Sequence, residues 1–481
     1  MKQHMLAVLD LLKQHKVDYA DIRINDIHEE HISTENMKVQ NLSTSHTRGF
    51  GVRVYLDGSM GFAASQDFDK MAEIALTALE IAKASRTAQQ QPVILSPKHV
   101  VEDHYSTPIQ IDPFTISKRE KLDLLFAAEK IMREAIPTLF KTEGSMDFRR
   151  EEKSFADTEG SFITQTLFES GGGMVAVAAG KADMQRRTFP NSFRGNFATA
   201  GYEFVLGLGL GENAERVAKE AAALLEAEAC PSGVFDVVID SSQLTLQIHE
   251  SIGHPIELDR VLGYEAGYAG TSFLHPSMQG FKYGSEHVNV VADATVPGGL
   301  GTFGYDDEGV AAQRVPIITK GLFQNFVSSR DTAATIGAIS NGTARADSWN
   351  RPPIVRMTNI NLLPGTFELD DLIAGIEVGL LFSANKSWSI DDRRVNFQFA
   401  CEIAYEIKHG RLTGKIYKNP IYTGITPEFW NSCDGVANEK HWRMFGTPNC
   451  GKGQPGQVAH VGHGSSPARF RNVKVGVADV K

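Results

Sequence analysis

The segment from Gln247 to Pro255 constrains the chain most, because it sets two histidines and a glutamate beside a glycine and a proline. His249 and His254 are five residues apart, whereas the familiar zinc-protease helix separates its histidines by four. On a regular α-helix a five-residue step rotates the side chain by about 140°, which points His254 away from His249. Pro255 disfavours helix at the residue before it. We therefore expect the helix to end near Gly253, so that His254 can turn back toward His249.

The secondary structure just before His249 stays open on periodicity alone. Asp240 is a suitable cap for a helix, but Leu244, Leu246 and Ile248 also alternate as strand residues do. In a strand, His249 and Glu250 would face opposite sides, whereas on a helix they can share one cavity. A metal site in this segment therefore requires the helix.

If the helix forms, His249 and His254 can bind a catalytic zinc ion, with Glu250 as the general base on zinc-bound water. Such a site needs a third protein ligand, and composition does not select it. Cys450 lies in the glycine-rich segment 446–456, which can bring backbone close to an ion, whereas Cys401 lies in an apolar segment typical of a buried thiol. The candidates are His275, His287, His409, His441, His460, His463, Cys401, Cys433 and Cys450.

Two other interpretations of the motif remain open on the residues alone. His-Glu-x-x-x-His can arise by chance, and the histidines are then ordinary polar residues at a helix end. Alternatively, the chain is a non-catalytic binding or scaffold subunit with a structural metal or none. Glu250 distinguishes these classes, because a structural site has no need of a general base.

Composition indicates a globular chain with ample core. Its 481 residues are 42% hydrophobic and 22% charged, which is ordinary for such proteins. A net charge of −10 argues against nucleic acid or an anionic membrane as a general partner. Four scattered cysteines fit a reducing compartment, and no segment reaches the length of a membrane-spanning helix. We therefore expect a cytoplasmic protein.

Turn residues and periodicity divide the chain into three predicted domains, residues 1–90, 110–229 and 232–481. Asp57-Gly58 between two alternating segments predicts a β-hairpin. The predicted fold class is α+β, with an N-terminal α/β half of two sheet-and-helix units and a C-terminal, largely antiparallel β domain that carries the metal site.

Two local signals in the central domain carry further predictions. Ser117 and Glu120 form a capping box for a helix running to about Ala135. Residues 205–211 resemble a phosphate-binding turn, but their glycine spacing is wrong for the dinucleotide motif, so no nucleotide cofactor is expected.

Several separated motifs together resemble the TldD/PmbA family, also called modulators of DNA gyrase. The resemblance spans nearly the whole chain and implies a cytoplasmic zinc metallopeptidase acting on peptides and unfolded protein segments. It assigns His249, His254 and Cys450 as the zinc ligands and Glu250 as the catalytic glutamate. The motifs are Arg48-Gly49-Phe50-Gly51-Val52-Arg53-Val54, His249-Glu250-x-x-x-His254, Tyr305-Asp306-Asp307-Glu308-Gly309, Ser340-Asn341-Gly342-Thr343-Ala344-Arg345-Ala346, Arg356-Met357-Thr358-Asn359 and Cys450-Gly451-Lys452-Gly453-Gln454.

The family pairs a motif-bearing subunit with a related subunit that lacks the motif. The resemblance therefore implies a dimer, with itself or with such a relative, and this chain resembles the catalytic, TldD-like subunit. A thiolate ligand adds negative charge, which should weaken the Lewis acidity of zinc.

Two features have no assigned role. His460 and His463 follow Cys450 closely, and of the two roles considered, ligand support or surface, we expect surface. The turn Asp306-Asp307-Glu308 could orient ligands or form a solvated acidic surface, and we leave it out of the predicted site.

Overall fold

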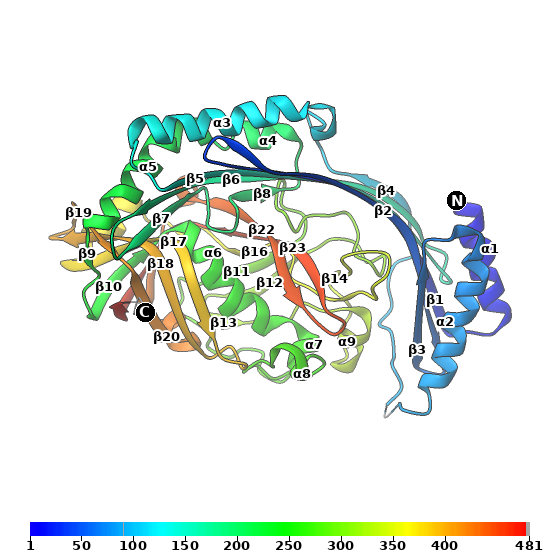
Figure 1. Cartoon of the computed structure of the whole chain (residues 1–481). Coiled ribbons are helices and arrows are strands. Elements are labelled where there is room, and N and C mark those ends of the chain that lie inside the picture. Colours follow the sequence, from blue (N-terminus) through cyan, green and yellow to red (C-terminus); the bar gives the residue numbers. More distant parts are fainter. Residues whose placement is uncertain (90, 478–481) are drawn as a thin grey trace.

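The N-terminal half of the chain forms one long curved sheet that arches over the C-terminal half in the computed structural model (Figure 1). The structure describes residues 1–89 and 91–477. The strands are β1 (Tyr19–Glu35), β2 (Lys38–Leu56), β3 (Ser59–Ser65), β4 (Glu102–Ser106), β5 (Lys141–Asp157), β6 (Phe162–Ala179), β7 (Met184–Phe189) and β8 (Asn196–Ala198). They lie in the order β3-β2-β1-β5-β6-β4, with β7 and β8 also paired to β6.

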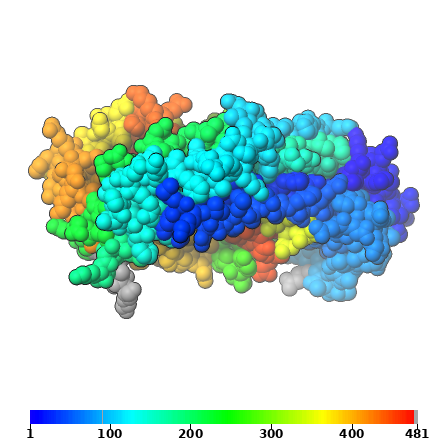
Figure 2. Space-filling model, turned by 45° about the horizontal axis from the view of Figure 1, so that its top comes forward, coloured from blue at the N-terminus to red at the C-terminus, as the bar shows by residue number. Residues whose placement is uncertain are grey.

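Two groups of helices cover the outer face of this sheet. The helices α1 (Lys2–Gln14) and α2 (Met71–Ser85) pack on one end of it, and α3 (Lys118–Ala135) and α5 (Leu210–Glu226) pack on the other. The predicted capping box of Ser117 and Glu120 is present at the start of α3. Neither group of helices covers the first half of β2, whose residues are exposed from Lys38 to His46, and Figure 2 shows this blue strip beside the cyan α3.

The two predicted sheet-and-helix units share a single sheet. β1 pairs with β5 without interruption from Asp21 opposite Asp157 to Glu35 opposite Glu143. Local periodicity predicts strands but not which distant strands pair, so this continuity was not predictable. The predicted hairpin is confirmed, because β2 and β3 pair across Asp57 and Gly58, which both have positive φ, 48° and 75°.

The C-terminal half is rich in antiparallel strands, as predicted, and its main sheet closes on itself. Its strands are β9 (Glu228–Ala229), β10 (Gly233–Ile239), β17 (Val378–Ile390), β18 (Asn396–Lys408), β19 (Arg411–Lys418), β20 (Pro420–Ile425), β21 (Cys433–Val436) and β24 (Ala468–Val477). The pairing runs β17-β10-β24-β20-β18, and β18 pairs back to β17, which closes a ring of five strands. The largest hydrophobic core of the molecule lies in this half.

Smaller elements complete the C-terminal half. The hairpin of β22 (Arg443–Lys452) and β23 (Gln457–Ser465) lies beneath the arch in the middle of the molecule (Figure 1). The remaining strands are β11 (Val290–Asp293), β12 (Arg314–Thr319), β13 (Leu322–Phe323), β14 (Ala344–Arg345), β15 (Ile354–Val355) and β16 (Ile360–Leu362). The remaining α-helices are α4 (Tyr202–Leu206), α6 (Ser241–Ile248), α7 (Leu258–Val261), α8 (Ala266–Ala269), α9 (Arg330–Thr335), α10 (Leu369–Ala374) and α11 (Thr426–Asn431).

The acidic turn Asp306-Asp307-Glu308 joins the two halves. All three side chains are buried. Lys153 of β5 pairs with Asp307 at 2.7 Å, and Arg53 of β2 pairs with Glu308 at 2.9 Å. Asp306 instead accepts backbone N–H groups of its own turn. Neither role considered from the sequence is correct, because the turn is not solvated and its ion pairs hold the arch to the C-terminal half.

Two findings bear on the environment of the chain. All four cysteines are free and buried. Among the described residues, none of the helices combines the length and the apolarity needed to span a bilayer.

Candidate metal centre

The helix that carries the first predicted ligand widens into a π-helical turn. α6 ends at Ile248, and over His249–Gly253 the N–H of His254 donates to the carbonyl of His249. Because this bond spans five residues rather than four, the turn accommodates one extra residue and brings His254 onto the face of His249. The strand alternative is thus excluded.

The π-helical turn ends at Gly253, near the predicted helix end, but His254 does not leave helical backbone as predicted, because a 3-10 turn follows over His254–Ile256. His254 keeps helical backbone angles, φ −66° and ψ −41°, and extended backbone begins only at Glu257. Gly253 serves packing instead, because a Cβ there would lie 2.1 Å from the Sδ atom of Met357. A wider, π-helical turn therefore brings His249 and His254 together despite their five-residue spacing. Regular α-helical geometry alone would not predict this turn.

The structure brings His249, His254 and Cys450 together. One ligand atom of each lies within 4.8 Å of the others, and Cys450 Sγ is 3.9 Å from His254 Nε2. In tetrahedral zinc sites the bond lengths imply roughly 3.6 Å between the sulfur and nitrogen ligand atoms. Small side-chain rotations would therefore place all three ligand atoms at bonding distance from one shared ion. Cys450 lies within β22 rather than in a loop, and the glycine-rich turn follows it.

Glu250 shares a cavity with all three. The cavity has a volume of about 250 Å³. Its wall combines the polar side chains of the motif with the aromatic side chains of Phe193 and Trp388, whose rings meet edge to face. The remaining wall residues are Leu246, Arg394, Thr447, Asn449 and Gly451.

A hydrogen-bond relay fixes the tautomer of His249. His463 Nδ1 lies 3.3 Å from the carbonyl oxygen of Ile360, to which it can only donate, so His463 Nε2 is an acceptor. His249 Nδ1 lies 2.8 Å from that acceptor and therefore carries the proton. Burial lowers the pKa values of both imidazoles. His249 is thus neutral with a free lone pair on Nε2, the form that binds a metal.

The contacts of His254 assign its tautomer in the same way. Its Nδ1 lies 2.9 Å from the carboxylate of Glu257, which can only accept, and 3.3 Å from the guanidinium NH2 of Arg260. The shorter contact makes Nδ1 the donor, which leaves the lone pair of Nε2 facing Cys450. Burial lowers the pKa of His254 despite this carboxylate. Glu257 also lies 3.4 Å from the ammonium of Lys452, so buried charge ties the histidine-bearing turn to β22.

The environment of Cys450 favours the thiolate. Burial alone would raise the pKa of this thiol, but the positive charge of Arg356 lowers it below its ordinary value. The Arg356 guanidinium donates to the backbone carbonyls of Cys450 and Gln457, which keeps its charge beside the sulfur. A lowered pKa is typical of thiols that bind metals.

The prediction that His460 and His463 lie at the surface is wrong for His463. His463 is fully buried and supports His249. Successive residues of a strand face opposite sides, so His460 points away from the metal centre. It lies 2.5 Å from Glu169 in the pocket between the arch and the C-terminal half.

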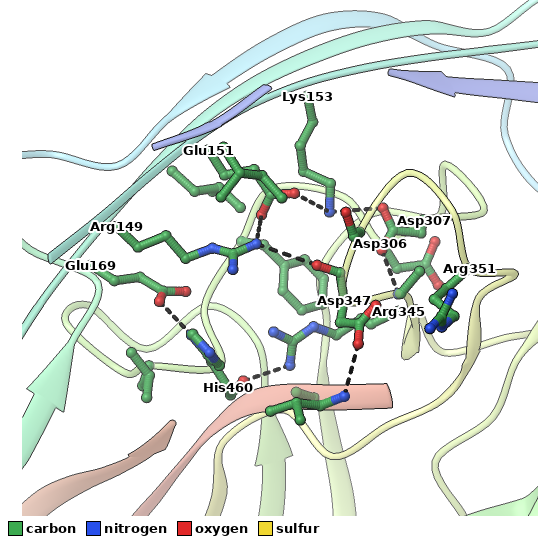
Figure 3. Close-up of a pocket in the computed structure, with 18 of the residues that line it drawn as sticks. Arg149, Glu151, Lys153, Glu169, Asp306, Asp307, Arg345, Asp347, Arg351 and His460 are labelled. Atoms are coloured by element: carbon green, nitrogen blue, oxygen red, sulfur yellow. Dashed lines mark hydrogen bonds and ion pairs between the residues drawn. The ribbon is translucent and has the colours of Figure 1, made fainter. Parts of the chain in front are cut away.

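That pocket is larger than the metal cavity, about 440 Å³, and strongly charged (Figure 3). Arg149, Glu151, Lys153 and Glu169 reach into it from the arch. Its charges are largely paired among themselves, for example Arg149 with Glu151 at 3.2 Å. We therefore assign it no ligand.

One other cluster of potential ligands occurs among the described residues, formed by Asp26, His28 and His46 on β1 and β2. Both histidines lie near one oxygen of Asp26, at 3.3 and 2.8 Å. The other oxygen is 3.3 Å from the guanidinium of Arg48. The exposed position of His46 and this fixed cation disfavour a second metal there, so we assign none.

Replacing His463 with phenylalanine should weaken metal binding by about 10- to 100-fold, the usual cost of losing a hydrogen bond to a ligand histidine. The ring volume is retained, but His249 Nδ1–H loses its acceptor. Competition with a fluorescent zinc chelator measures the affinity. His460→Phe, on the opposite face of β23, is the matched control and should bind as the wild type does. Equal affinities in both variants would contradict the relay.

From the sequence, His463 is a candidate but is expected at the surface, Arg356 appears only within a family motif without a role, and Arg394 is not considered. The alternation of buried Ala459, Val461 and His463 along one strand face was a usable signal for His463. Nothing in the local sequence marks Arg394, because tertiary contacts place it at the cavity.

Comparisons with known proteins identify the family of the chain. Models of the PmbA/TldA metallopeptidase family match residues 20–82 as domain 1, 111–227 as the central domain and 232–476 as the C-terminal domain. A metalloprotease of Methanothermobacter thermautotrophicus is 30% identical over 461 residues, which cover 96% of each chain. A metalloprotease of Methanocaldococcus jannaschii is 29% identical over 458 residues, 94% of this chain and 96% of its own.

Solved structures share the fold over the full length. A protein described as a modulator of a DNA gyrase from Thermotoga maritima superposes with a TM-score of 0.79 at 16% identity, covering 99% of this chain and 100% of its own. TldE from Thermococcus kodakarensis gives 0.75 at 17% identity, with 98% and 99% covered. The chain therefore belongs to the TldD/PmbA family of metallopeptidases.

Proposed function

We propose that the chain is a zinc-dependent peptidase that hydrolyses peptide bonds in peptides and unfolded protein segments. The observation that carries the proposal is the grouping of His249, His254 and Cys450 at a cavity that Glu250 also lines. Two neutral imidazoles and a thiolate suit a tetrahedral zinc site that leaves its fourth position to water or substrate. The name of a relative in Saccharolobus solfataricus, zinc metalloprotease TldD homolog, adds support at 25% identity over 246 residues, 51% of this chain and 52% of its own.

The chemistry divides between the ion and Glu250. Zinc held by the three ligands would polarise the peptide carbonyl and make water more acidic. Glu250 accepts a proton from water while the water oxygen bonds to the carbonyl carbon, and the C=O electron pair moves onto the carbonyl oxygen. When the C–N bond breaks, Glu250 returns the proton to the leaving amine. One water is consumed, and one carboxyl end and one amino end are formed.

We propose that the peptide lies extended along β22. In the described part of the chain β22 pairs only with β23, and Thr447, Asn449 and Gly451 of β22 line the cavity. A Cβ atom at Gly451 would meet nothing within 4 Å. An added strand is read through its main chain and tolerates many side chains, but a folded domain cannot offer one.

We also propose that the chain works as a dimer, with itself or with a related subunit. Every residue of β2 from Lys38 to His46 is exposed. Within the described residues, this part of β2 pairs only with β1. Val39 and Leu42 on it are 47% and 43% exposed. Proteins usually cover a long free edge of this kind, and a second subunit would do so.

The test combines the metal content of the purified protein with cleavage of one polypeptide in two states. We expect about one zinc per chain, cleavage of a reduced and alkylated disulfide protein, and no cleavage of the same protein when folded. Sedimentation of the same sample should give the mass of two chains. Zinc without any cleavage, or efficient cleavage of the folded form, would contradict the proposal.

A further inference from the structure

Arg394 contributes a fixed positive charge to the wall of the metal cavity, among the lining residues that the structure describes. It lies in the turn between β17 and β18, far in sequence from the histidine motif. Its side chain is 13% exposed, and its guanidinium NH1 approaches Glu250 Oε2 at 3.4 Å. Arg394 is therefore in the same cavity as the proposed base and the proposed ligands.

The N–H groups of the Arg394 guanidinium make only weak or shared hydrogen bonds, and one has no acceptor. The contact with Glu250 is long compared with the ~2.8 Å of a good charge-assisted hydrogen bond. NH2 donates to the carbonyl of Ala269 at 3.2 Å, but that carbonyl already accepts from Arg260 at 2.8 Å. The Nε atom is buried without any partner in the structure. A buried N–H without an acceptor is costly, so the group is suited to an incoming oxygen.

The backbone holds Arg394 in a strained conformation at this place. Its φ is 63°, which is unfavourable for a residue with a side chain. Three neighbours fix the turn. The N–H of Arg394 donates to Asp391 at 2.9 Å, the hydroxyl of Thr426 donates to the carbonyl of Arg394 at 2.8 Å, and the N–H of Thr271 donates to the carbonyl of Asp392 at 2.7 Å. The side chain is thus positioned in advance.

We propose that Arg394 is a catalytic residue that donates a hydrogen bond to the carbonyl oxygen of the scissile peptide as negative charge develops there. This inference rests on the proposed function. Donors fixed in a buried site before the reaction are the groups that stabilise such an oxygen most effectively. The electron pair that leaves the C=O bond is stabilised by the guanidinium, and Arg394 neither gains nor loses a proton.

The three proposed zinc ligands give a physical reason for a positively charged Arg394 in this cavity. The thiolate of Cys450 neutralises part of the charge that zinc would bring, so the ion alone polarises a carbonyl less than it would with a neutral third ligand. The guanidinium of Arg394 supplies a further positive charge in the cavity, close to Glu250. It also differs from a lysine in keeping its charge when buried.

The test compares Arg394→Gln with Arg393→Gln, a neighbouring arginine of the same turn that is exposed. We expect Arg394→Gln to lower kcat by about 10²- to 10³-fold, as loss of one oxyanion donor does, with KM changed less than about threefold. Zinc content and the melting temperature should stay at wild-type values. Affinity for a phosphinic peptide, whose tetrahedral phosphorus carries the charged oxygens, should fall by the same factor as kcat.

A second measurement separates this role from others. On the inactive Glu250→Gln background, the added Arg394→Gln should leave the affinity for uncleaved peptide unchanged. If KM rises while kcat stays, Arg394 binds the ground state, for example a terminal carboxylate, and the inference is wrong. If kcat falls without loss of phosphinic-peptide affinity, Arg394 only positions Glu250, and the inference is also wrong.

A conservative variant covers the case in which Arg394→Gln does not fold. Arg394→Lys keeps a cation and should retain more activity and more phosphinic-peptide affinity than Arg394→Ala. Equal values for the two would overturn the inference. The wild type and Arg393→Gln report separately on the proposed function. If both are inactive with zinc bound, the proposed function is wrong, whereas an Arg394 variant as active as they are refutes this inference alone.

Discussion

Glu250→Gln should lose peptide hydrolysis while it keeps its zinc. The substitution removes the carboxylate that accepts the proton of water, and loss of a general base lowers kcat by about 10²- to 10⁴-fold. Glu250 is not among the three grouped ligand residues, so the metal content should stay at the wild-type value. Cleavage of an unstructured fluorogenic peptide, measured beside the zinc content of the same sample, checks both expectations.

The matched control is Glu428→Gln, an exposed glutamate on α11 outside the metal cavity. It should cleave at the wild-type rate. Unchanged hydrolysis in Glu250→Gln would refute the proposed mechanism. It would favour the alternative in which the chain is a binding or scaffold subunit and any metal is structural.

His249→Ala and Cys450→Ala should each lose the metal itself. Either substitution leaves only two of the three grouped donors. The affinity should therefore fall by more than the ~100-fold limit for a lost supporting hydrogen bond. Because binding to the folded state alone raises stability, added zinc should raise the melting temperature of the wild type and not that of either variant.

Cys230→Ala is the control for removal of a buried thiol. Cys230 is 1% exposed and burial raises its pKa to about 12, so it is a neutral thiol outside the metal cavity. This variant should bind zinc as the wild type does. Full zinc occupancy in Cys450→Ala would exclude Cys450 as a ligand, and one of the other histidines would have to replace it.

Signals confined to a few neighbouring residues were predictable from the sequence. Asp57-Gly58 dictates a turn with positive φ, and Ser117 with Glu120 satisfies the first N–H groups of α3, so both elements appear where they were expected. The α+β class follows from the same local patterns. The motif residues His249, Glu250 and His254 were also identifiable, because they lie close together in the chain.

Features that depend on distant contacts were not predictable in this way. The π-helical turn at His249 has no local marker, although Gly253 allows the close approach of Met357 that accompanies it. The acidic side chains of Asp307 and Glu308 made a solvated turn plausible. In the structure both are buried, because they form ion pairs with Lys153 and Arg53 of the arch. His463 contacts His249, and Arg394 lines the metal cavity, only because the fold of the distant strands brings them there.

The closed ring of five strands has a consequence for synthesis on the ribosome. β24 lies between β10 and β20, so the ring cannot close before the residues up to 477 have been made. Domains generally fold as units during synthesis, and the arch can form earlier. α6, which leads into His249, follows β10 directly, and Cys450 lies nearly two hundred residues later. A nascent chain therefore cannot complete the group of His249, His254 and Cys450 until nearly its whole length has been made.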